Sequence, residues 1–190
     1  MKLFSTLALL FSSAITASAA MLDLGTAAGY TPYDNYMRPV RTVLSSLEGQ
    51  GTDMARVQSL MKQGRNFRYS FTDPYTAAMP SETASRRAGD CKAKSLWLAE
   101  QIGAEDIRFV VGKARRTSKL SHAWVMWKNE GRWWVLDCTN TAKPIALDTV
   151  GSSQYIPLYS WAKDGTYRHS STKLFANGAV AGKAAVADRR

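Results

Sequence analysis

The chain has 190 residues, a length that suits one domain with a short leader. Its 25 lysines and arginines outnumber its 15 aspartates and glutamates, which gives a net charge of +10. This charge favours anionic partners such as envelope polymers. The cations are scattered, however, and no zinc-finger spacing or RNA-binding motif occurs, so we expect no nucleic-acid partner. With two histidines and two cysteines, the sequence also lacks metal-site spacing, and we expect neither a metal nor a cofactor.

Residues 1–20 have the layout of a secretory signal peptide. Lys2 precedes a short apolar run, and small residues follow it up to Ala20. The run is shorter than the roughly 20 apolar residues that a membrane-spanning helix needs, and no later segment is more apolar. We therefore expect a secreted or periplasmic protein with no membrane span; a buried N-terminal helix is the alternative.

The first half of the remaining chain predicts a leader, two helices and a long loop. Residues 21–33 are small and polar and predict a flexible leader. Apolar residues at spacings of three and four predict helices over residues 36–48 and 53–63. Residues 72–90 are rich in proline, serine and threonine and predict a long irregular connection. Loops of that length inside a domain are often functional.

The second half begins with one more helix, over residues 91–102, which Gly103 ends. Aromatic and β-branched runs then predict five strands: Ile107–Val111, His122–Trp127, Trp133–Cys138, Pro144–Leu147 and Tyr155–Trp161. Helices followed by strands indicate an α+β domain over residues 34–175, with N-terminal helices packed on an antiparallel sheet. Residues 176–190, rich in alanine and glycine, predict a mobile tail.

Cys91 stands at the start of the third predicted helix, directly after Gly89 and Asp90. A cysteine nucleophile reacts as its thiolate, and a helix N-terminus lowers the pKa of a thiol. The backbone N–H groups at that helix start can also face a developing oxyanion. The position of Cys91 therefore predicts a catalytic nucleophile.

His122 begins one predicted strand, and Asp137 lies at the end of the next. An even hairpin loop centred between Asn129 and Glu130 would pair His122 directly with Asp137, at a Cβ separation of about 5 Å. The carboxylate would then orient the imidazole and stabilise its protonated form. A three-residue turn would instead place Cys138 opposite His122.

Three blocks of this sequence, Gly89–Leu96, His122–Trp124 and Trp133–Thr139, resemble those of the bacterial transglutaminase-like cysteine peptidase superfamily. The similarity covers residues 65–140. It implies a papain-like, transglutaminase-like α+β fold.

The resemblance also implies roles for three residues. Cys91 would be the nucleophile, His122 the general base and acid, and Asp137 the residue that orients the histidine. Members of the superfamily hydrolyse or transfer amide bonds, usually without a metal. The leading hypothesis is an exported hydrolase that cleaves peptide or protein amides through an acyl-enzyme on Cys91.

Two alternatives remain open. A transamidase would use the same three residues but pass the acyl group to an amine, because access to the cleft decides the acceptor. A non-catalytic envelope-binding module would instead join Cys91 and Cys138 in a disulfide, the usual state of two cysteines in an exported protein. Adjacent strand residues point to opposite faces, so Asp137 can face His122 only if Cys138 points away.

The sequence leaves the side chain that completes the oxyanion site open. Tyr69, Tyr75 and Gln101 are the candidates. His169 lies in a polar stretch, and we expect it to be solvated and without a catalytic role.

Overall fold

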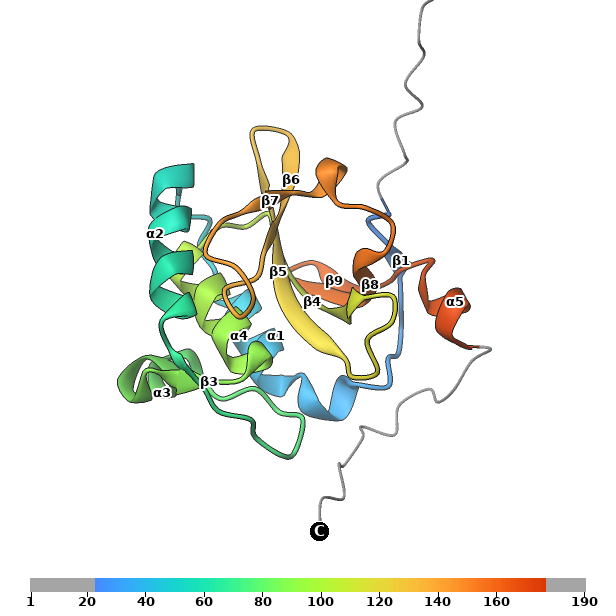
Figure 1. Ribbon diagram of the computed structural model, residues 1–190, viewed down its shortest axis with the longest axis horizontal. Coiled ribbons are helices and arrows are strands. Elements are labelled where there is room, and N and C mark those ends of the chain that lie inside the picture. Colours follow the sequence, from blue (N-terminus) through green and yellow to red (C-terminus); the bar gives the residue numbers. More distant parts are fainter. Residues whose placement is uncertain (1–22, 177–190) are drawn as a thin grey trace, which may run out of the picture.

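The computed structural model describes residues 23–176, and these form the predicted α+β domain. Helices cover one face of a seven-stranded antiparallel sheet (Figure 1). The predicted signal peptide, and all of the predicted tail except Ala176, lie outside the described residues. No helix within residues 23–176 has the length and apolar character needed to traverse a bilayer.

Four helices precede the main strands, where three were predicted. They are α1 (Arg38–Ser45), α2 (Met54–Arg65), α3 (Pro80–Arg86) and α4 (Cys91–Ile102). The unpredicted helix, α3, lies within the segment expected to be irregular. Pro80 occupies its first turn, where a missing N–H costs nothing and the fixed φ favours a helix. A short helix, α5 (Thr172–Ala176), ends the described chain.

The large sheet has the strand order β1-β9-β8-β4-β5-β6-β7. Its members are β1 (Thr26–Ala27), β4 (Ile107–Arg115), β5 (His122–Asn129), β6 (Arg132–Leu136), β7 (Ile145–Ala146), β8 (Gln154–Ala162) and β9 (Gly165–Arg168). A separate parallel pair, β2 (Arg68–Tyr69) and β3 (Ala88–Gly89), leads directly into α4. The central strand β4 pairs with both β5 and β8, so it brings the C-terminal hairpin beside the strand that carries His122.

Residues 23–33 are not the flexible leader that their composition predicts. Thr26 and Ala27 form β1, which pairs with β9 at the edge of the sheet. The Asp23 carboxylate accepts hydrogen bonds from the N–H and the hydroxyl of Ser170, both at 2.7 Å. An edge strand offers unpaired backbone groups that another segment can satisfy, and local composition does not reveal such a distant partner.

His169 is also not solvated as expected. Its side chain is buried, with Nε2 2.9 Å from the Ser160 hydroxyl and Nδ1 3.0 Å from the Asp23 carbonyl oxygen. Burial lowers the pKa of this histidine. It therefore joins β8 to the start of the described chain as a neutral structural residue.

α4 is the helix at the centre of the domain. Ten of its twelve residues are buried, including Lys92 and Lys94, because other helices pack on one side of it and β5 on the other. The Ser95 hydroxyl donates a hydrogen bond to the Ala123 carbonyl oxygen at 3.1 Å. This contact fixes the N-terminal half of α4 against the first residues of β5.

The hairpin between β5 and β6 has a different register from both predicted ones. Glu130 and Gly131 form a two-residue turn with φ angles of 50° and 76°, and Asn129 pairs with Arg132. Positive φ at both positions is typical of the type I′ turn, whose twist matches that of the strands. The register differs by two residues from the predicted even loop. A shift of two keeps every side chain on the same face, so Asp137 stays on the side of His122.

Gly112, which pairs with His122 across the sheet, offers a test of this packing. A Cβ atom at Gly112 would overlap the Ile156 carbonyl oxygen and lie 2.7 Å from Cη2 of Trp124. We expect Gly112→Ala to lower the free energy of unfolding by about 1–3 kcal/mol, because the neighbours are backbone and a buried ring. The matched control is Gly151→Ala, where a Cβ meets no atom within 4 Å. Urea unfolding measures both, and equal midpoints for the two variants would contradict this account.

Candidate active site

Cys91 occupies the first position of α4 and is a free, buried thiol. Asp90 caps the helix: its Oδ1 accepts hydrogen bonds from the N–H groups of Lys92 and Ala93, both at 3.1 Å. The N–H of Cys91 is another of the groups at a helix N-terminus that have no partner within the helix. The sulfur therefore lies at the positive end of the α4 dipole.

The turn before Cys91 is held tightly. A Cβ atom at Gly89 would lie 2.8 Å from Cβ of Ala93, so the chain can enter α4 this closely only with glycine there. Asp90 is fully buried and forms an ion pair with Lys92, which is 1% exposed. Asp90 Oδ2 also accepts hydrogen bonds from the N–H and the hydroxyl of Thr72, at 3.2 and 3.0 Å. The cap thus fixes both Cys91 and the loop that follows β2.

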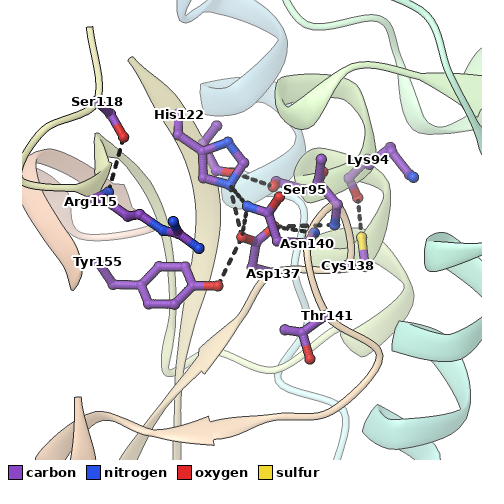
Figure 2. Close-up of polar contacts among 12 residues, drawn as sticks. Lys94, Ser95, Arg115, Ser118, His122, Asp137, Cys138, Asn140, Thr141 and Tyr155 are labelled. Carbon is purple, nitrogen blue, oxygen red and sulfur yellow. Dashed lines mark hydrogen bonds and ion pairs between the residues drawn. The ribbon is translucent and has the colours of Figure 1, made fainter. Parts of the chain in front are cut away.

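The structure brings His122 and Asp137 together. Nε2 of His122 lies 2.8 Å from Oδ2 of Asp137, which is fully buried at the end of β6 (Figure 2). The ring of His122 also stacks on Trp124, with 6.1 Å between centroids and 25° between planes. Because Nε2 faces the carboxylate, Nδ1 is the ring nitrogen left for the sulfur of Cys91.

The electrostatics of His122 favour its protonated form. Burial alone would lower the pKa of His122, but the hydrogen bonds with Asp137 and Cys91, and the charges of both residues, outweigh it. Together they raise the pKa of His122 to about 10. Because Cys91 is among the groups that raise this pKa, its sulfur lies within interaction range of the imidazole.

Two further side chains hold Asp137, and the sequence analysis missed both. Asn140 Nδ2 lies 2.7 Å from Oδ2 of Asp137 and 3.1 Å from Nε2 of His122. The Tyr155 hydroxyl donates to the same carboxylate oxygen at 3.0 Å (Figure 2). Burial raises the pKa of Asp137, but the hydrogen bond and charge of His122, and then the hydrogen bonds of Asn140 and Tyr155, lower it by more, so the carboxylate stays ionised.

Asn140 had a local signal in the sequence that Tyr155 lacked. Oδ1 of Asp137 accepts from the N–H of Thr139 at 3.1 Å and of Asn140 at 3.3 Å. An aspartate followed within three residues by threonine and asparagine is typical of such side-chain-capped turns. Tyr155 lies on β8, and no local sequence pattern indicates that β8 comes close to the end of β6.

Cys138 points away from this group, and the disulfide alternative is wrong. Both cysteines are free, and the Cys138 sulfur lies 3.7 Å from the Lys94 carbonyl oxygen, in the core beneath α4. Burial raises the pKa of Cys138 to about 12. It is an inert buried thiol.

Of the three oxyanion candidates, Tyr75 is the best placed. Its hydroxyl is buried and has no hydrogen-bond partner. Burial first, and the charge of nearby Cys91 second, raise its pKa well above the usual value. Tyr69 is also close enough to Cys91 for their charges to interact, but its side chain is largely exposed. Gln101 lies ten residues along α4 from Cys91, about 15 Å away by the helical rise, and cannot contribute.

Within residues 23–176, no cluster of three or more histidine, cysteine, aspartate or glutamate side chains could hold a metal ion.

A scan of the sequence against models of known protein families finds no match, and neither does a search of curated proteins. Solved structures do match. LapG of Legionella pneumophila superposes with a TM-score of 0.53 at 16% identity, over 70% of this chain and 78% of LapG. EGTA-treated LapG gives a TM-score of 0.50 at 16% identity, over 69% and 74% of the two chains. A candidate cysteine protease from Cytophaga hutchinsonii gives 0.41 at 12% identity, over 70% and 59%.

The fold is papain-like and transglutaminase-like. The structural likeness to LapG covers more of the chain than the three blocks from which the sequence predicted this fold. At 16% identity, this likeness establishes the fold alone.

The two thiols should differ in reactivity towards iodoacetamide. We expect Cys91 to be alkylated at least tenfold faster than Cys138 at pH 7, because Cys138 is buried with a pKa of about 12. His122→Ala should slow the labelling of Cys91, since it removes the imidazolium that stabilises the thiolate. Cys138→Ala is the control and should leave Cys91 labelling unchanged. Mass spectrometry of tryptic peptides gives both rates, and labelling of Cys91 that does not depend on His122 would refute the pairing.

Proposed function

We propose that this protein is a cysteine hydrolase that cleaves peptide or protein amide bonds through an acyl-enzyme on Cys91. The observation that carries the proposal is the joint geometry of Cys91, His122 and Asp137. A thiol at a helix N-terminus, an imidazole held protonated beside it and a buried carboxylate behind the imidazole are the parts of a cysteine nucleophile site. The likeness of the fold to LapG supports this reading.

The first half of the reaction forms the acyl-enzyme. The Cys91 thiolate attacks the carbonyl carbon, a C–S bond forms, and the π electrons of the carbonyl move to its oxygen. The Cys91 N–H and the Tyr75 hydroxyl are the donors that this oxyanion would meet. When the intermediate collapses, the C–N bond breaks and Nδ1 of the His122 imidazolium gives its proton to the departing amine.

The second half releases the acid. Neutral His122 takes a proton from water as the water oxygen attacks the thioester carbon. The C–S bond then breaks, and the thiolate and imidazolium are restored. Asp137 keeps the imidazole oriented throughout and stabilises its charge, while Asn140 and Tyr155 keep the carboxylate in place.

We also propose that the protein works outside the cytoplasm, in the periplasm or as a secreted protein. The layout of residues 1–20 supports this location. A free thiolate in an oxidising compartment is exposed to oxidation, and in this structure neither Cys91 nor Cys138 forms a disulfide.

The acyl-enzyme itself is the decisive test. Incubation with casein-derived peptides followed by acid quenching should give, by mass spectrometry, a thioester adduct on Cys91. Cys91→Ala should abolish the adduct, and His122→Ala should lower its rate by at least 100-fold, while Cys138→Ala should behave as the native protein. Added labelled lysine would appear in the product if an amine is the preferred acceptor. Peptide cleavage that survives in Cys91→Ala would refute the proposal.

Tyr75→Phe tests the oxyanion site. Removing one oxyanion donor commonly costs about 100-fold in kcat, and we expect a loss of that order with KM little changed. The ring packs against Tyr33 and Tyr36, and phenylalanine keeps that packing, so the unfolding midpoint should not fall. Tyr69→Phe, whose exposed ring also lies near Cys91, is the matched control and should retain most activity. Equal effects of both variants would reject the assignment of Tyr75.

A further inference from the structure

The end of β4 and its connection to β5 carry positive charge shortly before His122 in the chain. Arg115, Arg116 and Lys119 are exposed, and we call these three residues the basic turn. No aspartate or glutamate occurs between residues 107 and 129. Among the ion pairs of the described residues, none includes a side chain of the basic turn. The turn therefore presents uncompensated charge at the edge of the site.

The backbone of the basic turn is held in place, while its charged groups are free. The Ser118 N–H donates to the Arg115 carbonyl oxygen at 2.9 Å, and the Ser118 hydroxyl accepts from the Arg115 N–H at 3.2 Å. The Arg116 N–H donates to the Ser153 carbonyl oxygen at 2.8 Å, which joins the turn to the segment before β8. A binding surface on such a backbone loses little entropy when a ligand orders it.

Arg115 connects the basic turn to the reacting groups. Figure 2 shows its guanidinium extending beside Tyr155, whose hydroxyl contacts Asp137. Burial and the charge of Asp137 raise the pKa of Tyr155, and the charge of Arg115 opposes that rise, so the guanidinium lies within electrostatic range of the hydroxyl. Asp137 in turn contacts His122, so Arg115 is linked to the catalytic histidine through Tyr155 and Asp137. An anion bound by Arg115 would thus lie next to the site and not on a remote face.

We infer that the basic turn binds an acidic segment of the substrate, so that aspartate or glutamate residues lie on the His122 side of the scissile bond. Guanidinium groups match carboxylates in a two-pronged geometry, and complementary charge at a rim sets partner choice and association rate. This inference rests on the proposed function, because it takes the bound acidic segment to be part of a substrate. The binding itself does not need turnover. An anionic polymer is the competing ligand, and the test below separates the two.

The experiment measures binding by the full chain carrying Cys91→Ala, which cannot form an acyl-enzyme. The probes are two fluorescein-labelled octapeptides of equal length, one with four glutamates and one with glutamines in their place, and inorganic polyphosphate of matched charge. Fluorescence anisotropy at low ionic strength gives each Kd. A failure of the amide-cleaving proposal would show in turnover and leave these binding constants unaffected.

Two triple variants remove the same charge from different places. One changes the basic turn, Arg115→Gln, Arg116→Gln and Lys119→Gln, and the matched control changes exposed cations of α2, Arg56→Gln, Lys62→Gln and Arg65→Gln.

We expect the glutamate peptide to bind about tenfold more weakly to the basic-turn variant, with the control variant close to the parent. The glutamine peptide should bind the parent about tenfold more weakly than the glutamate peptide. Equal losses of affinity in the two triple variants would show that only the net charge of the protein matters, and would overturn the inference. Equal affinity for the two peptides, or tighter binding of polyphosphate than of the glutamate peptide, would overturn it as well.

Discussion

The start of α4 is the constraint on which the rest of the site depends. A buried Asp90 both caps the helix and binds Lys92, and it also holds Thr72 in the loop after β2. An ionised carboxylate in the core is costly unless it is paired and hydrogen-bonded, and here every one of its contacts orders a segment next to Cys91. The Ser95 contact with β5 then sets this helix start against the strand that carries His122. Position of the sulfur is thus determined by buried polar contacts more than by apolar packing.

A second set of polar contacts fixes the other half of the site. The Asp137 carboxylate accepts hydrogen bonds from His122, Asn140, Tyr155 and two backbone N–H groups. So many donors keep it ionised despite burial, and the ionised carboxylate keeps the imidazole protonated. The two halves lie on different layers, one on a helix and one on the sheet. Their alignment therefore relies on the packing of α4 against β5.

The sequence predicted what depends on short-range pattern. The helix from Cys91 to Ile102 has its predicted bounds, because the Asp90 cap and Gly103 stop are local signals. The face shared by His122 and Asp137 was predicted although the register was not, since a shift of two residues leaves the alternation unchanged. The turn type depended on whether Glu130 would adopt positive φ, a choice that non-glycine residues rarely make and that the strands impose.

What the sequence could not predict are contacts between distant segments. Helical periodicity alone would place Lys92 and Lys94 on a solvent-exposed face, yet both are buried. Lys92 forms an ion pair with the Asp90 carboxylate, and Lys94 donates a hydrogen bond to the Phe67 carbonyl oxygen. Tyr155 and His169 likewise act through partners that only the sheet order brings near.

The arrangement of charge across the site has a consequence for the kind of substrate it can accept. Asp90 and Asp137, the carboxylates closest to the reacting groups, are both buried and both engaged by donors from this chain. They offer no free charge to a ligand. The basic turn, by contrast, is exposed, and none of its side chains takes part in an ion pair among the described residues. A site with compensated anions inside and uncompensated cations outside attracts a negative chain without electrostatic opposition from Asp90 or Asp137. Substrate selection would therefore depend on exposed cations and catalysis on buried carboxylates, and Arg115 and Tyr155 form the link between the two.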